Sequence, residues 1–148
     1  MLHNANNYAF KILDLMKKLL FILLLTCISC STPKICPNLI YDSVTKTTFL
    51  EDKELYTGRC LTSNEDESSS IKQYLNGKDY GKWTFYYANG QVETKGKFNK
   101  NGERVGTWKF YYESGALKQI SKYSNNGDRT GKWVQYNPEG EIIDEIKY

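Results

Sequence analysis

Histidine is almost missing from this sequence, because His3 is the one histidine among 148 residues. Beyond it, no side chain can serve as the histidine base of a Ser-His-Asp triad or as a histidine ligand of zinc. Cysteine is scarce, with four residues, and no G-x-x-x-x-G-K-S/T loop for phosphate occurs. The acidic residues Asp79, Glu103 and Asp128 recur near one position of a repeat, which favours solvated turns. We therefore expect a chain that is not an enzyme and that uses neither a metal nor a cofactor.

A repeat of fixed length occupies the C-terminal half of the chain. The segments GKWTFYYANG, GTWKFYYESG and GKWVQYNPEG begin at residues 81, 106 and 131, so each step is 25 residues (106 − 81 and 131 − 106). The matched positions include Trp83, Trp108 and Trp133, and also Tyr86, Tyr111 and Tyr136. A period of this length indicates a tandem array of one supersecondary unit.

Each unit is predicted to form two short strands joined by a tight turn. Residues 82–87 are rich in the aromatic and β-branched residues that favour strands, and Asn89-Gly90 is a strong hairpin signal. The fold class that follows is all-β, an elongated open antiparallel sheet of tandem hairpins. The repeat domain is expected to span residues 54–148, with units near 54–75, 76–98, 99–123 and 124–148.

The first unit is degenerate. Its strands are expected near Tyr56–Leu61 and Ser70–Leu75, with the acidic run at 64–67 as a solvated turn. Residues 30–53 form an extension with little signal, in which Val44–Leu50 could be an edge strand.

Alternation along the strands predicts two different faces, because residues two apart share a face. The rings expected to fill the space between hairpins, as the repeat core, are Trp83, Phe85, Trp108, Phe110 and Trp133. The opposite face keeps Tyr86, Tyr111 and Tyr136 and is the candidate binding face. In the last unit Gln135 and Asn137 replace rings, which is typical of a polar terminal cap.

Residues 1–29 are expected to be a signal segment, helical in its apolar part. From Met16 the chain reads MKKLLFILLLTCISCS, with a basic pair, a short apolar run and the small Ser29 before Cys30. This order describes a secretory signal, and roughly ten apolar residues are too few for a bilayer, which takes about 20. The arrangement resembles a bacterial lipoprotein signal, in which Cys30 carries the lipid. The alternatives are an ordinary cleaved signal and an uncleaved anchor.

The lipoprotein interpretation places the chain in the bacterial cell envelope, anchored to a membrane. Residues 1–15 then either precede the true start codon or extend the basic region of the signal.

Removal of the signal changes the cysteine and charge counts. Cys36 and Cys60 remain beside Cys30, and in an oxidising compartment they can form a disulfide that ties the extension to the first hairpin. The alternative is two free thiols. The charges nearly balance, with 17 Lys and Arg (20 − 3) against 16 Asp and Glu (17 − 1). Without a basic field, nucleic acid is a poor partner.

The pattern G-x-W-x-F-Y-Y-x-x-G, followed by an N-G-x-x-x-G turn, resembles MORN repeats. It is most similar to the variant found in the YwqK family of proposed bacterial antitoxins. The resemblance covers roughly residues 54–148. It implies an open sheet of hairpins that serves as a binding or scaffolding surface, and within the YwqK family it implies neutralising a toxin by protein contact.

The function expected from these features is that of a membrane-anchored, protein-binding repeat module. Its partner would be a protein of unknown identity, with a toxin as the specific form that the resemblance implies. Tyr and Trp are enriched among interface anchors, which favours this interpretation. Two alternatives stay open: a module that binds envelope carbohydrate or cell wall through exposed aromatic rows, and an envelope scaffold that associates at sheet edges.

Overall fold

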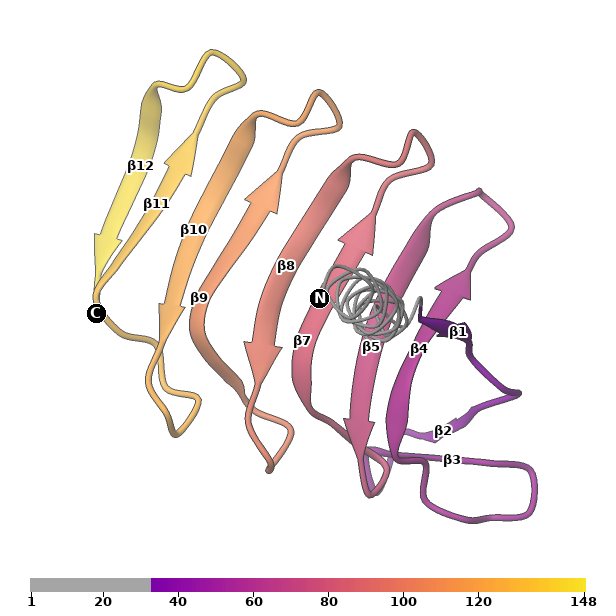
Figure 1. Cartoon of the computed structure of the whole chain (residues 1–148). Helices are drawn as coiled ribbons and strands as arrows, with labels where there is room; N and C mark the ends of the chain where they lie inside the picture. The colour runs from indigo at the N-terminus through magenta and orange to yellow at the C-terminus, as the bar shows by residue number, and fades with distance from the viewer. Residues whose placement is uncertain (1–32) are drawn as a thin grey trace, which may run out of the picture. The chain divides into compact units, whose positions relative to one another are not determined.

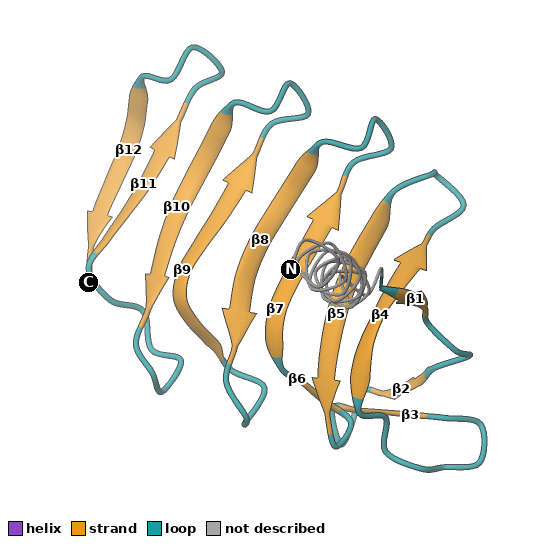
Figure 2. Ribbon diagram, viewed as in Figure 1, coloured by secondary structure: helices purple, strands orange, loops and turns teal. Residues whose placement is uncertain are grey.

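The computed structural model describes residues 33–148. The predicted signal segment and the predicted lipidation site at Cys30 lie outside these residues. Within them the chain is built from strands and loops, and no helix is found (Figure 2).

The main sheet contains ten strands, and its path is open rather than closed on itself. The strands of this sheet are β1 (Lys34–Ile35), β4 (Gly58–Ser63), β5 (Ser69–Leu75), β6 (Lys78–Asp79), β7 (Gly81–Tyr86), β8 (Val92–Phe98), β9 (Arg104–Tyr111), β10 (Leu117–Tyr123), β11 (Lys132–Tyr136) and β12 (Ile142–Lys147). From β4 to β12 neighbouring strands are antiparallel and follow chain order (Figure 1), and the short β6 pairs with β5. The predicted all-β fold of an open sheet of tandem hairpins is therefore confirmed.

The hairpins repeat with the sequence. The pairs β7–β8, β9–β10 and β11–β12 come from the three regular units, and β4–β5 is the hairpin of the degenerate first unit. The turns at Gly90, Gly115 and Gly140 hold these glycines at φ 80°, 87° and 89°. Only a residue without a Cβ adopts this left-handed conformation at little cost, so glycine recurs at this position.

Trp108 is packed flat against the strand before it. The Trp108 side chain is 1% exposed, although the sheet has a single layer at this point. A Cβ at Gly96 would overlap the Trp108 ring, so the ring lies directly on the β8 backbone. On its other side the Arg104 guanidinium lies 4.5 Å from the ring centroid. The ring is thus enclosed by a glycine below and a cation above.

The indole N–H groups are satisfied in the same way in every unit. Trp83 donates to the carbonyl of Gln73, Trp108 to that of Lys97 and Trp133 to that of Lys122, at 2.8, 3.3 and 2.9 Å. A buried indole therefore leaves no unpaired donor, which would otherwise cost stability.

A second column of rings alternates with the tryptophans and links the hairpins. Trp83 lies 5.5 Å from Tyr74 and 4.9 Å from Phe98, and Phe98 lies 5.0 Å from Trp108, as centroid distances. The rings meet edge to face, which is the arrangement that their quadrupoles favour. The tryptophan face of the sheet is consequently an aromatic ladder that joins one unit to the next.

The N-terminal extension is more structured than expected. A disulfide joins Cys36 to Cys60, and β1 pairs with β4 in parallel, so the sheet is mixed rather than purely antiparallel. The strands β2 (Ile40–Asp42) and β3 (Thr47–Phe49) form a separate two-stranded sheet. The predicted edge strand at Val44–Leu50 is thus β3, paired with β2. Cys36 and Leu39 pack against the aromatic core cluster, so the extension covers the start of the tryptophan face.

The predicted polar cap is wrong for the outer edge. Gln135 and Asn137 lie on or beside β11, one strand inside the edge. The edge strand β12 instead exposes Ile142, Ile143 and Ile146 at 59%, 60% and 45%. The replacement of rings by Gln135 and Asn137 did not indicate that β12, rather than β11, is the edge strand.

Truncation of Trp108 tests its role in the core. We expect Trp108→Ala to lower the free energy of unfolding by about 3–5 kcal/mol, because it removes a fully buried ring from the middle of the ladder. Urea denaturation followed by circular dichroism measures the change. Thr107→Ala, at the exposed neighbouring position, serves as the control and should have little effect. Equal midpoints for the two variants would contradict the packing role.

A substitution at Gly96 tests the contact from the other side. Gly96→Ala should destabilise the chain by roughly 1–3 kcal/mol, because the added methyl group must displace the Trp108 ring. The same denaturation assay measures it, with Lys100→Ala at the exposed turn after β8 as the reference. In the background of Trp108→Ala the Gly96→Ala penalty should disappear. A penalty that persists there would show that the ring is not its cause.

Candidate functional site

The predicted tyrosine row lies on the face of the sheet opposite the tryptophans. Each tyrosine stands directly across from an aliphatic side chain on the second strand of its hairpin. Tyr86 is opposite Val92, Tyr111 is opposite Leu117, and Tyr136 is opposite Ile142. All three tyrosines are half-buried, so part of each residue is accessible to a partner.

The same face carries an unexpected concentration of lysines. Residues directly opposite each other in an antiparallel pair share a face, and three such positions pair lysine with lysine. The opposed pairs are Lys82 with Lys97, Lys95 with Lys109, and Lys132 with Lys147. Together with the three tyrosines, these six lysines are called the lysine–tyrosine face.

Acidic residues mostly lie away from this face. In the three regular units, those at the turns and loops between strands are Glu103, Glu113, Asp128, Glu139 and Glu141. On the lysine–tyrosine face, Glu145 of β12 forms an ion pair with Lys132 at 2.7 Å. The near balance of total charge therefore conceals a local excess of cations, because six lysines gather on this face while several carboxylates lie at the hairpin ends.

Like charges placed directly across a strand pair destabilise a sheet by up to about 1 kcal/mol. Part of this cost is relieved locally, since the Lys95 ammonium lies 5.2 Å from the ring centroid of Tyr111, a cation–π distance. The fold does not require lysine at these positions, because the ladder that stabilises the hairpins is on the other face. What the arrangement can do is attract an anionic partner and anchor it on the tyrosine rings.

The total charge of the chain does not reveal this surface, because it says nothing about which face each lysine occupies. Alternation along a strand places Lys95 and Lys97 on one face, and the strand register adds Lys82 to the same face. A sequence analysis that followed lysine along each predicted strand would therefore have found part of it.

Across residues 33–148, no three or more His, Cys, Asp or Glu side chains gather as a metal site would require. In the same range, no helix has the length and hydrophobicity of a membrane span.

The fold and the exposed face define a class, that of tandem β-hairpin repeat proteins with an open sheet. The family description "MORN repeat variant" matches residues 79–100 and 104–125. The chain therefore contains two consecutive repeats of this variant. They coincide with the two units whose tryptophan and tyrosine positions are most alike.

The other comparisons add little. No curated protein matches the chain. Among solved structures, a chain of the GtfA/B complex bound to UDP and GlcNAc is similar, at 12% identity and a TM-score of 0.31. The likeness covers 73% of this chain and 28% of that chain. At this TM-score it supports no conclusion about fold or function.

A stability measurement tests whether the opposed lysines are a cost to the fold. Lys97→Gln should raise the free energy of unfolding by about 0.2–1 kcal/mol at low salt, because it removes the repulsion of Lys82. The gain should shrink as salt screens the charges. Lys100→Gln, at an exposed turn, is the control and should change little. A loss of stability in Lys97→Gln would contradict the interpretation.

Proposed function

We propose that this chain is a non-enzymatic binding module whose lysine–tyrosine face holds a protein partner with an acidic surface. The observation that carries the proposal is the set of three opposed lysine pairs beside a row of half-buried tyrosines. The presence of MORN repeat variants agrees with a binding role, since such repeats are generally protein- or membrane-binding modules. Tyrosine rings supply rigid apolar contacts, and lysines supply attraction and register.

A carbohydrate-binding role through the tryptophan column has less support. Stacking on a sugar requires an exposed ring, whereas Trp83 and Trp108 are 7% and 1% exposed. The tyrosine row remains accessible for such stacking, but the opposed lysines around it favour an anionic partner.

The proposal extends to the setting in which binding takes place. A lipid on Cys30 would anchor the module in the bacterial envelope, with residues 33–148 available to a partner there. The resemblance to the YwqK family suggests, more specifically, that the module neutralises a toxin encountered in the envelope. The proposal that the partner has an acidic surface does not depend on the partner being a toxin.

A comparative capture experiment tests the proposed face. The wild-type chain and two matched variants are used as baits against nuclease-treated, detergent-solubilised envelope extract. The face variant combines Lys82→Gln, Lys97→Gln and Lys109→Gln, and the control variant combines Lys34→Gln, Lys53→Gln and Lys100→Gln at exposed positions away from the face. Both remove three charges. We expect a protein with an acidic surface that wild type and control retain and that the face variant loses at least tenfold.

The tyrosines are tested separately with the captured protein in purified form. Tyr86→Ala, Tyr111→Ala and Tyr136→Ala together should weaken its binding while the aromatic ladder keeps the fold, checked by circular dichroism. The dissociation constant should rise with salt, because lysine contacts are screened. Equal capture by all baits, or binding that survives loss of both the lysines and the tyrosines, would overturn the proposal. Binding only to anionic vesicles or to glycans would overturn it as well.

A further inference from the structure

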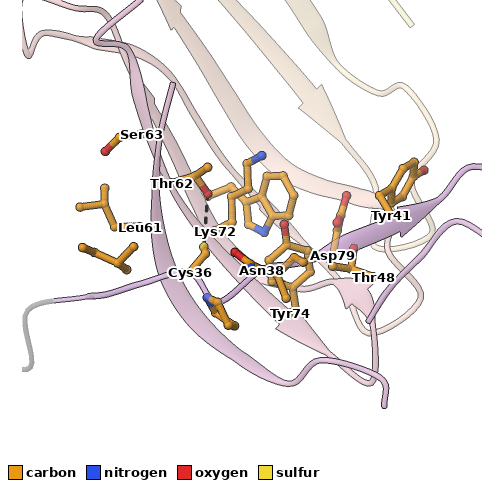
Figure 3. A pocket seen from close by; sticks show the side chains of 14 residues that line it. Cys36, Asn38, Tyr41, Thr48, Leu61, Thr62, Ser63, Lys72, Tyr74 and Asp79 are labelled. Atoms are coloured by element: carbon orange, nitrogen blue, oxygen red, sulfur yellow. Dashed lines mark hydrogen bonds between the residues drawn. The ribbon is translucent and has the colours of Figure 1, made fainter. Parts of the chain in front are cut away.

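A second site lies on the other face, where the N-terminal extension covers the first hairpin. It is a cavity of about 680 Å³, within the size range of small-molecule sites. Its walls include Tyr41 from the extension and Lys72, Tyr74 and Asp79 from the sheet (Figure 3). Leu39 and Trp83 also line it. The disulfide between Cys36 and Cys60 fastens the extension over it.

The first unit departs from the repeat pattern at the wall of this cavity. In the later units, Phe98 pairs with Arg104 and Tyr123 pairs with Arg129. Those arginines cover Trp108 and Trp133, with the guanidinium carbon 4.5 and 5.0 Å from the ring centroid. At the equivalent position the first unit pairs Tyr74 with Asp79. A carboxylate thus stands where the repeat places a guanidinium.

The strand position beside Trp83 also departs from the repeat pattern. The strand position beside each later tryptophan is small, Gly96 beside Trp108 and Ser121 beside Trp133. Beside Trp83 the register places Lys72, whose ammonium lies 5.3 Å from the Trp83 ring centroid and 5.7 Å from that of Phe85. The cation over the tryptophan is kept but comes from β5, which frees position 79 for a carboxylate.

The two charged groups line one cavity without forming a direct ion pair with each other. In residues 33–148 the ion pair found is Lys132 with Glu145, so Lys72 and Asp79 have no direct ionic partner there. Burial lowers the pKa of Lys72 and raises the pKa of Asp79, and in each case the charge of the other group opposes the shift. Each charge therefore lacks solvation that an opposite charge from a guest would replace.

We propose that this cavity binds a small zwitterion with an apolar body, such as a free amino acid or a short peptide with free termini. The guest carboxylate meets the Lys72 ammonium, the guest ammonium meets the Asp79 carboxylate, and the apolar body packs on Leu39 and Trp83. The opposed charges of the walls match a guest that is neutral overall. The site is separate from the lysine–tyrosine face and does not depend on the function proposed for it.

Isothermal titration calorimetry with the disulfide-intact chain tests the site. The probes are L-leucine and the dipeptide Leu-Leu with free termini, compared with N-acetyl-Leu-Leu and Leu-Leu-amide. We expect the free dipeptide or L-leucine to bind, and blocking either terminus to weaken dipeptide binding at least tenfold. Failure of both free probes to bind at millimolar concentration, or equal binding of free and blocked dipeptides, would overturn the proposal.

Two variants assign the charges to the residues. Lys72→Met should remove the loss caused by amidation, and Asp79→Asn should remove the loss caused by acetylation, since each variant lacks the group that recognises that terminus. The double change Lys72→Ser with Asp79→Arg restores the pattern of the later units. It should keep the near-ultraviolet tryptophan spectrum and abolish binding. Binding that survives in this variant would overturn the proposal, and if the variant fails to fold, the blocked dipeptides decide the matter on the wild-type chain.

Discussion

The stability of the repeat sheet depends on the contact between each tryptophan and the strand before it. A single-layer sheet has no second layer to bury its rings, yet Trp108 is 1% exposed. The ring lies on the backbone at Gly96, donates its N–H to a carbonyl of that strand, and is covered by Arg104. One side chain thereby combines apolar burial, a satisfied hydrogen bond and a cation–π contact. Because the contact crosses between hairpins, it also fixes each unit to the next.

Because the packing between repeats uses the tryptophan face, the opposite face of the sheet is not constrained by it. The tryptophan face carries the aromatic ladder and, at its start, the N-terminal extension. The opposite face is relieved of a packing role and carries opposed lysines and the tyrosine row. The acidic residues at the hairpin turns keep the total charge near balance. A partner with an acidic surface would therefore meet a field that the net charge of the chain does not predict.

The sequence was sufficient for the hairpins and for the tryptophan column, because both follow from a 25-residue period and from alternation within a strand. It was insufficient wherever contacts join residues far apart without a repeat. The parallel pairing of β1 with β4 and the two-stranded sheet β2–β3 are short and carry little local pattern. The polar cap was wrong because Gln135 lies one strand inside the edge. The departure at Asp79, which aligns with Arg104 and Arg129, is visible in the 25-residue repeat, whereas Lys72 aligns with Lys97 and only the strand register places it beside Trp83. The meeting of Lys72 and Asp79 in one cavity is visible only in the fold.

Hydrogen exchange of the three indole N–H protons, followed by nuclear magnetic resonance, tests the central contact most directly. Each tryptophan gives one signal, and each N–H is bonded to a carbonyl of the preceding strand. The account predicts slow exchange at Trp83 and Trp108, which are 7% and 1% exposed, and faster exchange at the more exposed Trp133 next to the edge strand. Rapid and equal exchange at all three positions would show that the rings do not lie against the sheet, and would contradict the account.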